Sequence, residues 1–187
     1  MEIIKKAEAM RQFDKKLYQA QPIFITTPQY WDGGIQSDSP LSDKAAFYAV
    51  TEKMSAIIKE VVQMLDEKPL IGMGLCEHQQ MHAHWSDLES HALFRAVASA
   101  IRKNRYYRLS LPEDGDVVDL IVESNFRYFT HISLFLPKAN LIIQPTCHTE
   151  VLAYTDADNA VLETLKQIAR KHSGEDCKIN VVLKGGS

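Results

Sequence analysis

The apolar positions in the first half of the chain recur every three or four residues, which is the pattern of an amphipathic helix. In the first eighteen residues these positions are Ile3, Ala7, Met10, Phe13 and Leu17. A second stripe predicts a helix over residues 42–66, which Pro69 terminates. A third helix is expected over residues 86–103, because Ser86 and Glu89 have the spacing of a capping box. We therefore expect three N-terminal helices.

From Arg105 onward the apolar period changes to two residues, which indicates strands. Strands are predicted at 105–111, 117–122, 127–136, 140–144 and 150–154, after an early β-favouring run at 23–26. Their short separators suit antiparallel neighbours. A fourth helix is expected from Asp156 to Gly174, and residues 178–183 form a final strand. The expected fold class is α+β, with the three N-terminal helices on one face of a mainly antiparallel meander of five or six strands.

Length and composition are those of one globular domain. The chain has 187 residues, of which 45% are hydrophobic and 24% charged, with a formal net charge of -3. We expect a single domain over residues 1–184, with a core that needs no metal or disulfide, and a flexible tail over 185–187. The mixed charges favour neither nucleic acid nor an anionic membrane as a partner. Three cysteines, no export signal and no apolar run of roughly 20 residues predict a cytoplasmic protein.

Residues 76–85, CEHQQMHAHW, hold three of the seven histidines. In an extended chain Cys76, His78, His82 and His84 would point to one side, whereas in a helix His78 and His82 would be the pair that can share a zinc ion. The two conformations select different ligands, and no established zinc motif is present. The favoured interpretation is a polar connector without metal or cofactor. The alternative is a metal-binding protein or metal-dependent hydrolase that uses His78, His82 and His84.

Two further motifs are explained by ordinary structure. Cys147 and His148 would face opposite ways on a strand, so they cannot form a catalytic pair with each other, although His131 is a more distant candidate. A buried cysteine is more often a small hydrophobic residue than a nucleophile. Residues 102–108, RKNRYYR, could grip phosphates and stack bases, but they also suit a helix C-terminus and the solvent side of a strand. We predict no catalytic residue.

The stretch TPQYWDGG contains aromatic residues where proline and glycine indicate surface. Tyr30 and Trp31 are either interface anchors or a lid that folds back over the core. Asp32 and Asp38 give this region an acidic rim, which suits a basic partner. In size, element pattern and lack of catalytic motifs the chain is similar to small bacterial immunity proteins, without a motif that defines them. We expect a non-enzymatic protein-binding module, of inhibitor or immunity type, whose partner contacts Tyr30, Trp31, Asp32 and Asp38.

Overall fold

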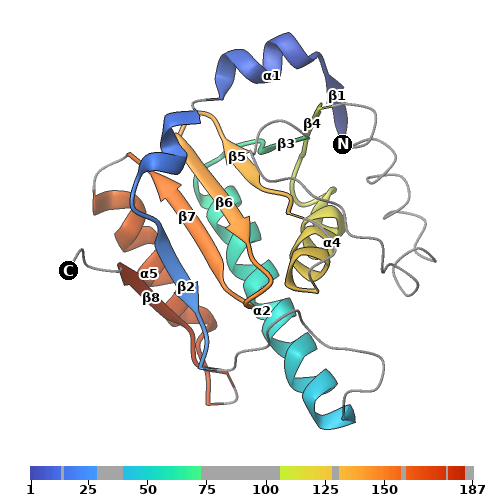
Figure 1. Cartoon of the computed structure of the whole chain (residues 1–187), viewed down its shortest axis with the longest axis vertical. Coiled ribbons are helices and arrows are strands. Elements are labelled where there is room, and N and C mark those ends of the chain that lie inside the picture. Colours follow the sequence, from blue (N-terminus) through green and yellow to red (C-terminus); the bar gives the residue numbers. More distant parts are fainter. Residues whose placement is uncertain are drawn as a thin grey trace.

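The computed structural model describes residues 1–13, 15–28, 40–72, 106–127, 131–156, 159–175 and 177–183. The helices in these ranges are α1 (Lys6–Gln12), the 3-10 helix η1 (Lys15–Gln19), α2 (Leu41–Met64), α4 (Gly115–Phe126) and α5 (Asn159–His172). The strands are β1 (Glu2–Ile4), β2 (Ile23–Thr26), β3 (Leu70–Gly72), β4 (Tyr106–Arg108), β5 (Leu134–Leu136), β6 (Leu141–Pro145), β7 (Val151–Thr155) and β8 (Asn180–Leu183). The fold mixes helices with an antiparallel sheet, as the α+β prediction states (Figure 1).

The strands form one 8-stranded sheet with the order β1-β4-β3-β5-β6-β7-β2-β8. Every neighbouring pair in it is antiparallel. The predicted meander is confirmed for β5, β6 and β7, which are consecutive neighbours. The predicted number of five or six strands was too small. The reason is that β1 lies in a segment predicted as helix and β3 has only three residues.

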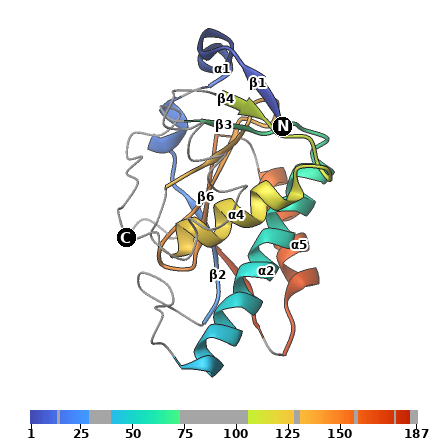
Figure 2. The ribbon, with the colours of Figure 1, turned by 90° about the vertical axis from the view of Figure 1, so that its right-hand side faces the viewer.

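The two faces of the sheet are covered by different helices. On one face α2, α4 and α5 pack against alternate strand residues such as Ile71 and Tyr107. The intervening residues, such as Leu70 and Tyr106, face the other way and pack with residues of α1 and η1. Figure 2 shows η1 and these three helices on opposite sides of the sheet. The prediction that the N-terminal helices share one face is therefore wrong for α1 and α2, and the helix predicted at 86–103 lies outside the described residues.

The helix predicted over residues 42–66 is confirmed by α2. One side of it is buried along almost its whole length, through Phe47, Val50, Met54, Ile57, Ile58, Val61 and Val62. In the C-terminal half of α2, the Glu60 carboxylate pairs with Lys171 and His172 of α5 at 2.9 and 2.8 Å. Helix α4 also packs against α2, so α2 is the central helix of this layer.

The continuous helix predicted for the first eighteen residues is wrong. This segment begins with β1, which pairs with β4. Lys5 then has an extended backbone, with φ -72° and ψ 141°, and α1 starts only after it. Of the predicted apolar stripe only Phe13 and Leu17 are buried, whereas Ile3 and Ala7 are exposed and Ile4 and Ala9 are buried instead. The helical period therefore misplaced the buried positions before Phe13, because pairing with β4 sets the backbone of the first residues.

The strand predicted at residues 117–122 is the middle of α4. Its apolar residues are all buried: Val117, Val118, Leu120, Ile121 and Val122. A helix that is buried on nearly all sides has the same continuous apolar run as a buried strand, so periodicity does not separate the two. The helix begins at Gly115, with Asp114 as its N-cap, between the segments predicted as strands at 105–111 and 117–122.

The other predictions for the second half are confirmed with shifted ends. Strand β4 lies within the segment predicted at 105–111, and β5 occupies only the end of that predicted at 127–136. Strands β6 and β7 coincide with their predicted segments to within one residue at each end. Helix α5 and strand β8 follow in the predicted order, and β2 matches the early run at 23–26.

Candidate functional site

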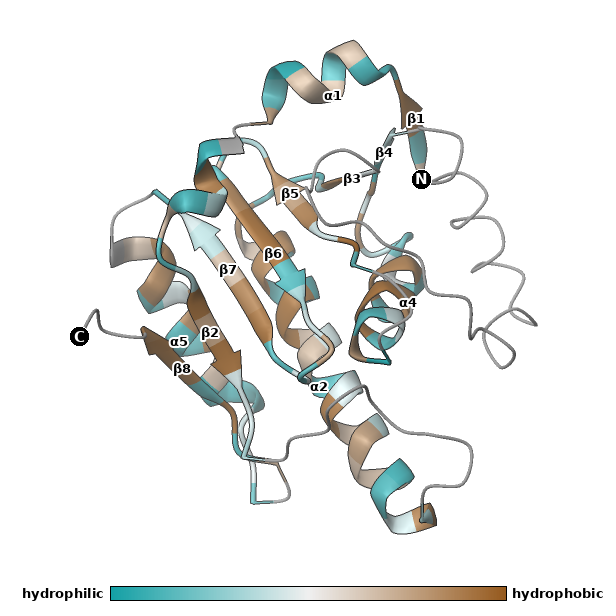
Figure 3. Cartoon of the chain, viewed as in Figure 1, coloured by the Kyte–Doolittle hydropathy of each residue, from teal (hydrophilic) through white to brown (hydrophobic). Residues whose placement is uncertain are grey.

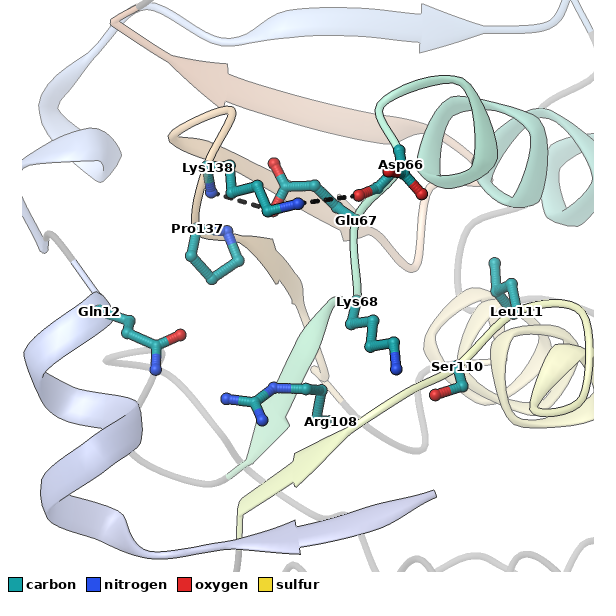
Figure 4. A pocket seen from close by; sticks show the side chains of 9 residues that line it. All are labelled: Gln12, Asp66, Glu67, Lys68, Arg108, Ser110, Leu111, Pro137 and Lys138. Carbon is teal, nitrogen blue, oxygen red and sulfur yellow. Dashed lines mark hydrogen bonds between the residues drawn. The ribbon is translucent and has the colours of Figure 1, made fainter.

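A polar pocket of about 500 Å³ lies where β3 begins and where β4 and β5 end. Its described lining residues come from four separate segments of the chain: Gln12, Asp66, Glu67, Lys68, Arg108, Ser110, Leu111, Pro137 and Lys138. Figure 4 shows these side chains around one space, with Gln12 and Arg108 on the side of α1 and Lys138 on the turn after β5. Only the folded chain brings these residues together.

Glu67 fixes one wall of the pocket. This residue is 7% exposed, and its carboxylate accepts hydrogen bonds from the backbone N–H groups of Lys138 at 3.0 Å and Ala139 at 2.5 Å. A buried carboxylate needs such compensation for its lost hydration. The bonds join the α2–β3 connection to the β5–β6 turn, in which Asn140 has a φ of 47°. Glu67 is therefore a structural group of the pocket wall.

Arg108 supplies one of the positive charges. Its guanidinium pairs with Glu8 of α1 at 2.8 Å and with Glu2 of β1 at 3.4 Å. The two carboxylates come from the segment that covers β4, so the ion pairs hold β1 and α1 against the neighbouring strand. They also balance the charge of Arg108.

Two lysines line the pocket without a carboxylate partner among the described residues. The Lys138 ammonium donates one hydrogen bond, at 3.1 Å, to the backbone carbonyl of Asp66. Lys68 is exposed, and in the described part of the chain its ammonium has neither a hydrogen bond nor an ion pair. An ammonium has three donors, so both lysines keep donors that a ligand can use.

Asp114 holds the segment after β4 that contributes Ser110 and Leu111. Its carboxylate accepts the Ser110 N–H at 2.7 Å and pairs with the Met1 ammonium at 2.7 Å. Burial alone would raise the pKa of Asp114, but the hydrogen bonds from Met1 and Ser110 outweigh burial and leave the pKa below its usual value. Asp114 therefore stays ionised at neutral pH and positions this side of the pocket.

A second groove, of about 420 Å³, lies between α5 and β8. Its described lining residues are Thr26, Lys166, Ala169, Arg170, Ile179, Asn180, Val181 and Val182. Lys166 and Arg170 are one helical turn apart and give the groove a cationic rim. Glu163 lies beside this rim, where the hydrogen bond from Lys166, together with the charges of Lys166 and Arg170, lowers its pKa. None of the described lining residues is acidic.

Strand β8 forms an open edge of the sheet. It pairs with β2 on one side, and no described strand pairs with its other side. Its four residues carry no charge, and Val182 and Leu183 are 44% and 49% exposed. Figure 3 shows the hydrophobic colour of β8 at this edge. Free backbone N–H and C=O groups beside exposed apolar side chains are a template for another strand.

The loop residues predicted to bind a partner lie outside the described residues. This holds for Tyr30, Trp31, Asp32 and Asp38, whose interface role stays a prediction. The histidine segment with Cys76, His78, His82 and His84 also lies outside them. Within the residues that the structure describes, no group of three or more His, Cys, Asp and Glu side chains could hold a metal ion.

The cysteine and histidine after β6 lie in a turn. Cys147 is half-buried and His148 is exposed, between β6 and β7. The turn is closed by the Thr146 N–H, which donates to the Glu150 carbonyl at 2.8 Å. Cys147 therefore lies in a turn and is only partly buried, and the choice between a small hydrophobic residue and a nucleophile stays a prediction. Cys177 is the buried cysteine of the described chain, and its sulfur lies 3.9 Å from the Thr27 hydroxyl.

Sequence reasoning did not identify either groove. Of the polar pocket it discussed only Arg108, as the solvent side of a strand, yet this side chain is 24% exposed and paired. Lys68 follows Asp66 and Glu67 and precedes Pro69, and Lys138 follows Pro137, which are patterns typical of any surface turn. The signal available for the second groove was the uncharged strand NVVL after a basic helix end, which we predicted as a strand but did not connect with binding.

Comparisons of the chain with protein-family models, with curated proteins and with solved structures found no match. Among the described helices, none combines the length and the apolar character that a membrane crossing requires. Function is therefore inferred from the geometry of the two grooves and of the sheet edge.

Proposed function

We propose that this protein is a non-enzymatic binding module of the cytoplasm that captures an extended segment of a partner protein along β8. The observation that carries the proposal is the open outer side of β8, with its uncharged sequence and the exposed side chains of Val182 and Leu183. A segment added there would form main-chain hydrogen bonds with β8 and place alternate side chains in the groove beside α5. Three cysteines, an odd number, suit a reducing compartment.

The charges of the groove favour an acidic partner segment. Lys166 and Arg170 line it; Lys166 already pairs with Glu163 beside the groove at 2.8 Å, so Arg170 is the cation of the described lining that is more available to a partner. Complementary charge directs a partner to its site and excludes segments of the wrong sign. We therefore propose an extended segment that alternates apolar and polar residues and carries glutamate or aspartate toward α5.

The predicted aromatic loop would add a second contact with the same partner. Thr26, at the end of β2, pairs with Asn180 at the start of β8, and Tyr30 and Trp31 follow Thr26 by only four and five residues in the sequence. Asp32 and Asp38 would meet a basic region of the partner, next to its acidic strand. A partner protein that is bound at both surfaces could not use its captured segment elsewhere. This outcome is consistent with an inhibitor or immunity-type role.

A labelled peptide tests this proposal directly. The probe is a peptide of about nine residues that alternates valine and threonine and ends in glutamates. Wild-type protein is expected to bind it in fluorescence anisotropy. Val182→Lys is expected to weaken binding at least about tenfold, because a lysine on an edge strand opposes strand addition. Ile3→Lys is the matched control, since Ile3 is 60% exposed on β1 at the other edge and should leave binding unchanged.

Two results would contradict the proposal. Equal affinity of Val182→Lys and wild-type protein for the peptide would show that β8 is not the binding edge. Light scattering gives the second: a dimer that Val182→Lys dissociates would identify a second copy of this chain, not a different protein, as the occupant of β8. A monomer that binds the acidic peptide supports the proposal.

A further inference from the structure

We infer that the polar pocket bounded by α1, β4 and the β5–β6 turn binds a phosphorylated, hydroxyl-rich small molecule such as a sugar phosphate. This site is independent of the proposed partner strand, because it lies beside β3 and β4, whereas β8 ends the opposite half of the sheet. Its volume of about 500 Å³ is larger than a bare phosphate needs and is within the range of small-molecule sites.

Lys68 and Lys138 provide the phosphate subsite. They reach the pocket from the α2–β3 connection and from the β5–β6 turn. Lys68 has no hydrogen bond or ion pair among the described residues, and the one bond of the Lys138 ammonium goes to the neutral carbonyl of Asp66. Two ammonium groups that lack a counter-ion favour a dianion in the same space.

Two carboxylates of the pocket, Asp66 and Glu67, oppose the binding of an anion, and one of them is occupied by hydrogen bonds. The Glu67 carboxylate, which would repel an anion, accepts the N–H groups of Lys138 and Ala139. The charge of Arg108 is balanced by Glu8 and Glu2, which its guanidinium contacts through Nη2 and Nη1. The cationic donors left for a ligand are therefore those of the two lysines, and the Asp66 carboxylate is the remaining negative charge, which a ligand hydroxyl can approach. Arg108 acts by holding α1 in place as a wall.

The rest of the pocket suits hydroxyl groups and does not suit a base or an apolar ring. The Gln12 amide and the Ser110 hydroxyl line it and make no hydrogen bond with the described residues, and the Asp66 carboxylate can accept from a ligand hydroxyl. None of the nine described lining residues is aromatic, and only Leu111 and Pro137 are apolar. A nucleobase would find no stacking surface among them.

Titration with ribose 5-phosphate, observed by isothermal calorimetry and by NMR shifts, tests the inference. Wild-type protein is expected to bind it with a dissociation constant of about 1 mM or below, and to bind unphosphorylated ribose too weakly to saturate. Lys68→Met and Lys138→Met keep the side-chain length but remove the charge, and each is expected to weaken binding at least about tenfold. Lys178→Met is the matched control, because Lys178 is exposed and lies outside this pocket.

The thermal midpoint of each variant shows whether it is folded, and a variant that unfolds is replaced by the corresponding Lys→Arg variant, which keeps the charge and is expected to bind. The inference is wrong if ribose 5-phosphate does not saturate, if both Lys→Met variants bind it as wild-type protein does, or if sulfate competes with equal affinity. The acidic peptide at β8 should bind equally well with and without ribose 5-phosphate, so failure of this site and failure of the proposed function give different results.

Discussion

The two edge strands of the sheet, β1 and β8, differ in how well they are protected against the addition of another strand. Strand β1 has three residues, and Glu2 on it pairs with Arg108 of the neighbouring strand at 3.4 Å. Strand β8 has four residues and no charge. Exposure alone does not separate the edges, because Ile3 on β1 is 60% exposed and Val182 on β8 is 44% exposed. The difference is that a short, charged edge resists the addition of another strand, whereas an uncharged edge accepts it.

Both edges are attached to the same core. The central strands β5, β6 and β7 contribute fully buried residues to the layer with α2, α4 and α5. Changes in this centre should destabilise both edges together, whereas changes at one edge should alter binding there and leave stability nearly unchanged. Predictions that separate these effects test the comparison.

The largest effect is expected from Asn125→Ala in the shared centre. Asn125 is fully buried, its amide donates to the carbonyls of Ile132 at 2.8 Å and Pro145 at 2.9 Å, and its carbonyl accepts the Ile132 N–H at 3.0 Å. Alanine would leave three buried backbone groups unsatisfied and lower the free energy of unfolding by about 2–4 kcal/mol. Urea denaturation measures this loss. A loss under about 1 kcal/mol would show that water replaces these bonds.

A smaller loss is expected from Glu67→Ala at the pocket end. Removing the carboxylate leaves the Lys138 and Ala139 N–H groups without their acceptor, which should cost about 2 kcal/mol. Hydrogen exchange of these two amides should accelerate, while binding of the acidic peptide at β8 is unchanged. Glu52→Ala, an exposed position on α2, is the control and should change neither quantity. If Glu67→Ala also weakened binding of the acidic peptide, the pocket and the β8 edge would be coupled.

At the open end, Arg170→Glu should reverse the preference for charge. The acidic peptide is expected to bind about fivefold more weakly, equivalent to roughly 1 kcal/mol, and its lysine counterpart more tightly. The free energy of unfolding measured in urea should stay within about 0.5 kcal/mol of the wild-type value, since the Arg170 side chain is exposed. Arg11→Glu on α1 offers a comparable exposed arginine at the far end, where the same reversal should have no effect. An unchanged preference in Arg170→Glu would remove the charge argument.

The smallest effect concerns the ion pairs that fasten α5, and with it the β8 groove, to α2. Hydrogen bonds from Lys171 and His172 lower the pKa of Glu60 below its ordinary value of 4.5. A lowered pKa means that the ionised carboxylate stabilises the fold above pH 4.5, and that this contribution is lost as the pH falls through the folded-state pKa. Because solvent reaches the pair, we expect less than about 1 kcal/mol.

Glu60→Gln measures this contribution in urea titrations at neutral and acid pH. The difference between wild type and Glu60→Gln should be present at pH 7 and disappear as the pH falls below the ordinary value of 4.5. A difference of the same size at both pH values would mean that shape or neutral hydrogen bonding, and not the charge of Glu60, accounts for it.

The parts of the fold that depend on neighbouring residues could be predicted from the sequence. The stripe of α2 and the short separators between β5, β6 and β7 are local patterns. Helix α4 could not be distinguished from a strand, because the residues from Val117 to Val122 are buried almost without exception. Strand order is also not local, since β2 lies between β7 and β8, which follow it by more than a hundred residues.

The candidate sites were harder to predict for the same reason. Lys68 and Lys138 are each the one lysine of their own connection, and only the meeting of the α2–β3 connection with the β5–β6 turn places them in a common pocket. The open side of β8 depends on its place at the end of the sheet, which no periodicity encodes. The residues that the sequence singled out, Tyr30 and Trp31, still require their own test by substitution.

Hydrogen exchange of the backbone amides of β8 shows most directly whether a partner strand adds to this edge of the sheet. Exchange is measured on the full chain with and without the acidic peptide. The account predicts that amides of residues 180–183 exchange more slowly in the complex, while those of β1 are unchanged, because a new strand satisfies only the outer groups of β8. Peptide binding that leaves the β8 amides unprotected, or that protects β1 instead, would contradict it.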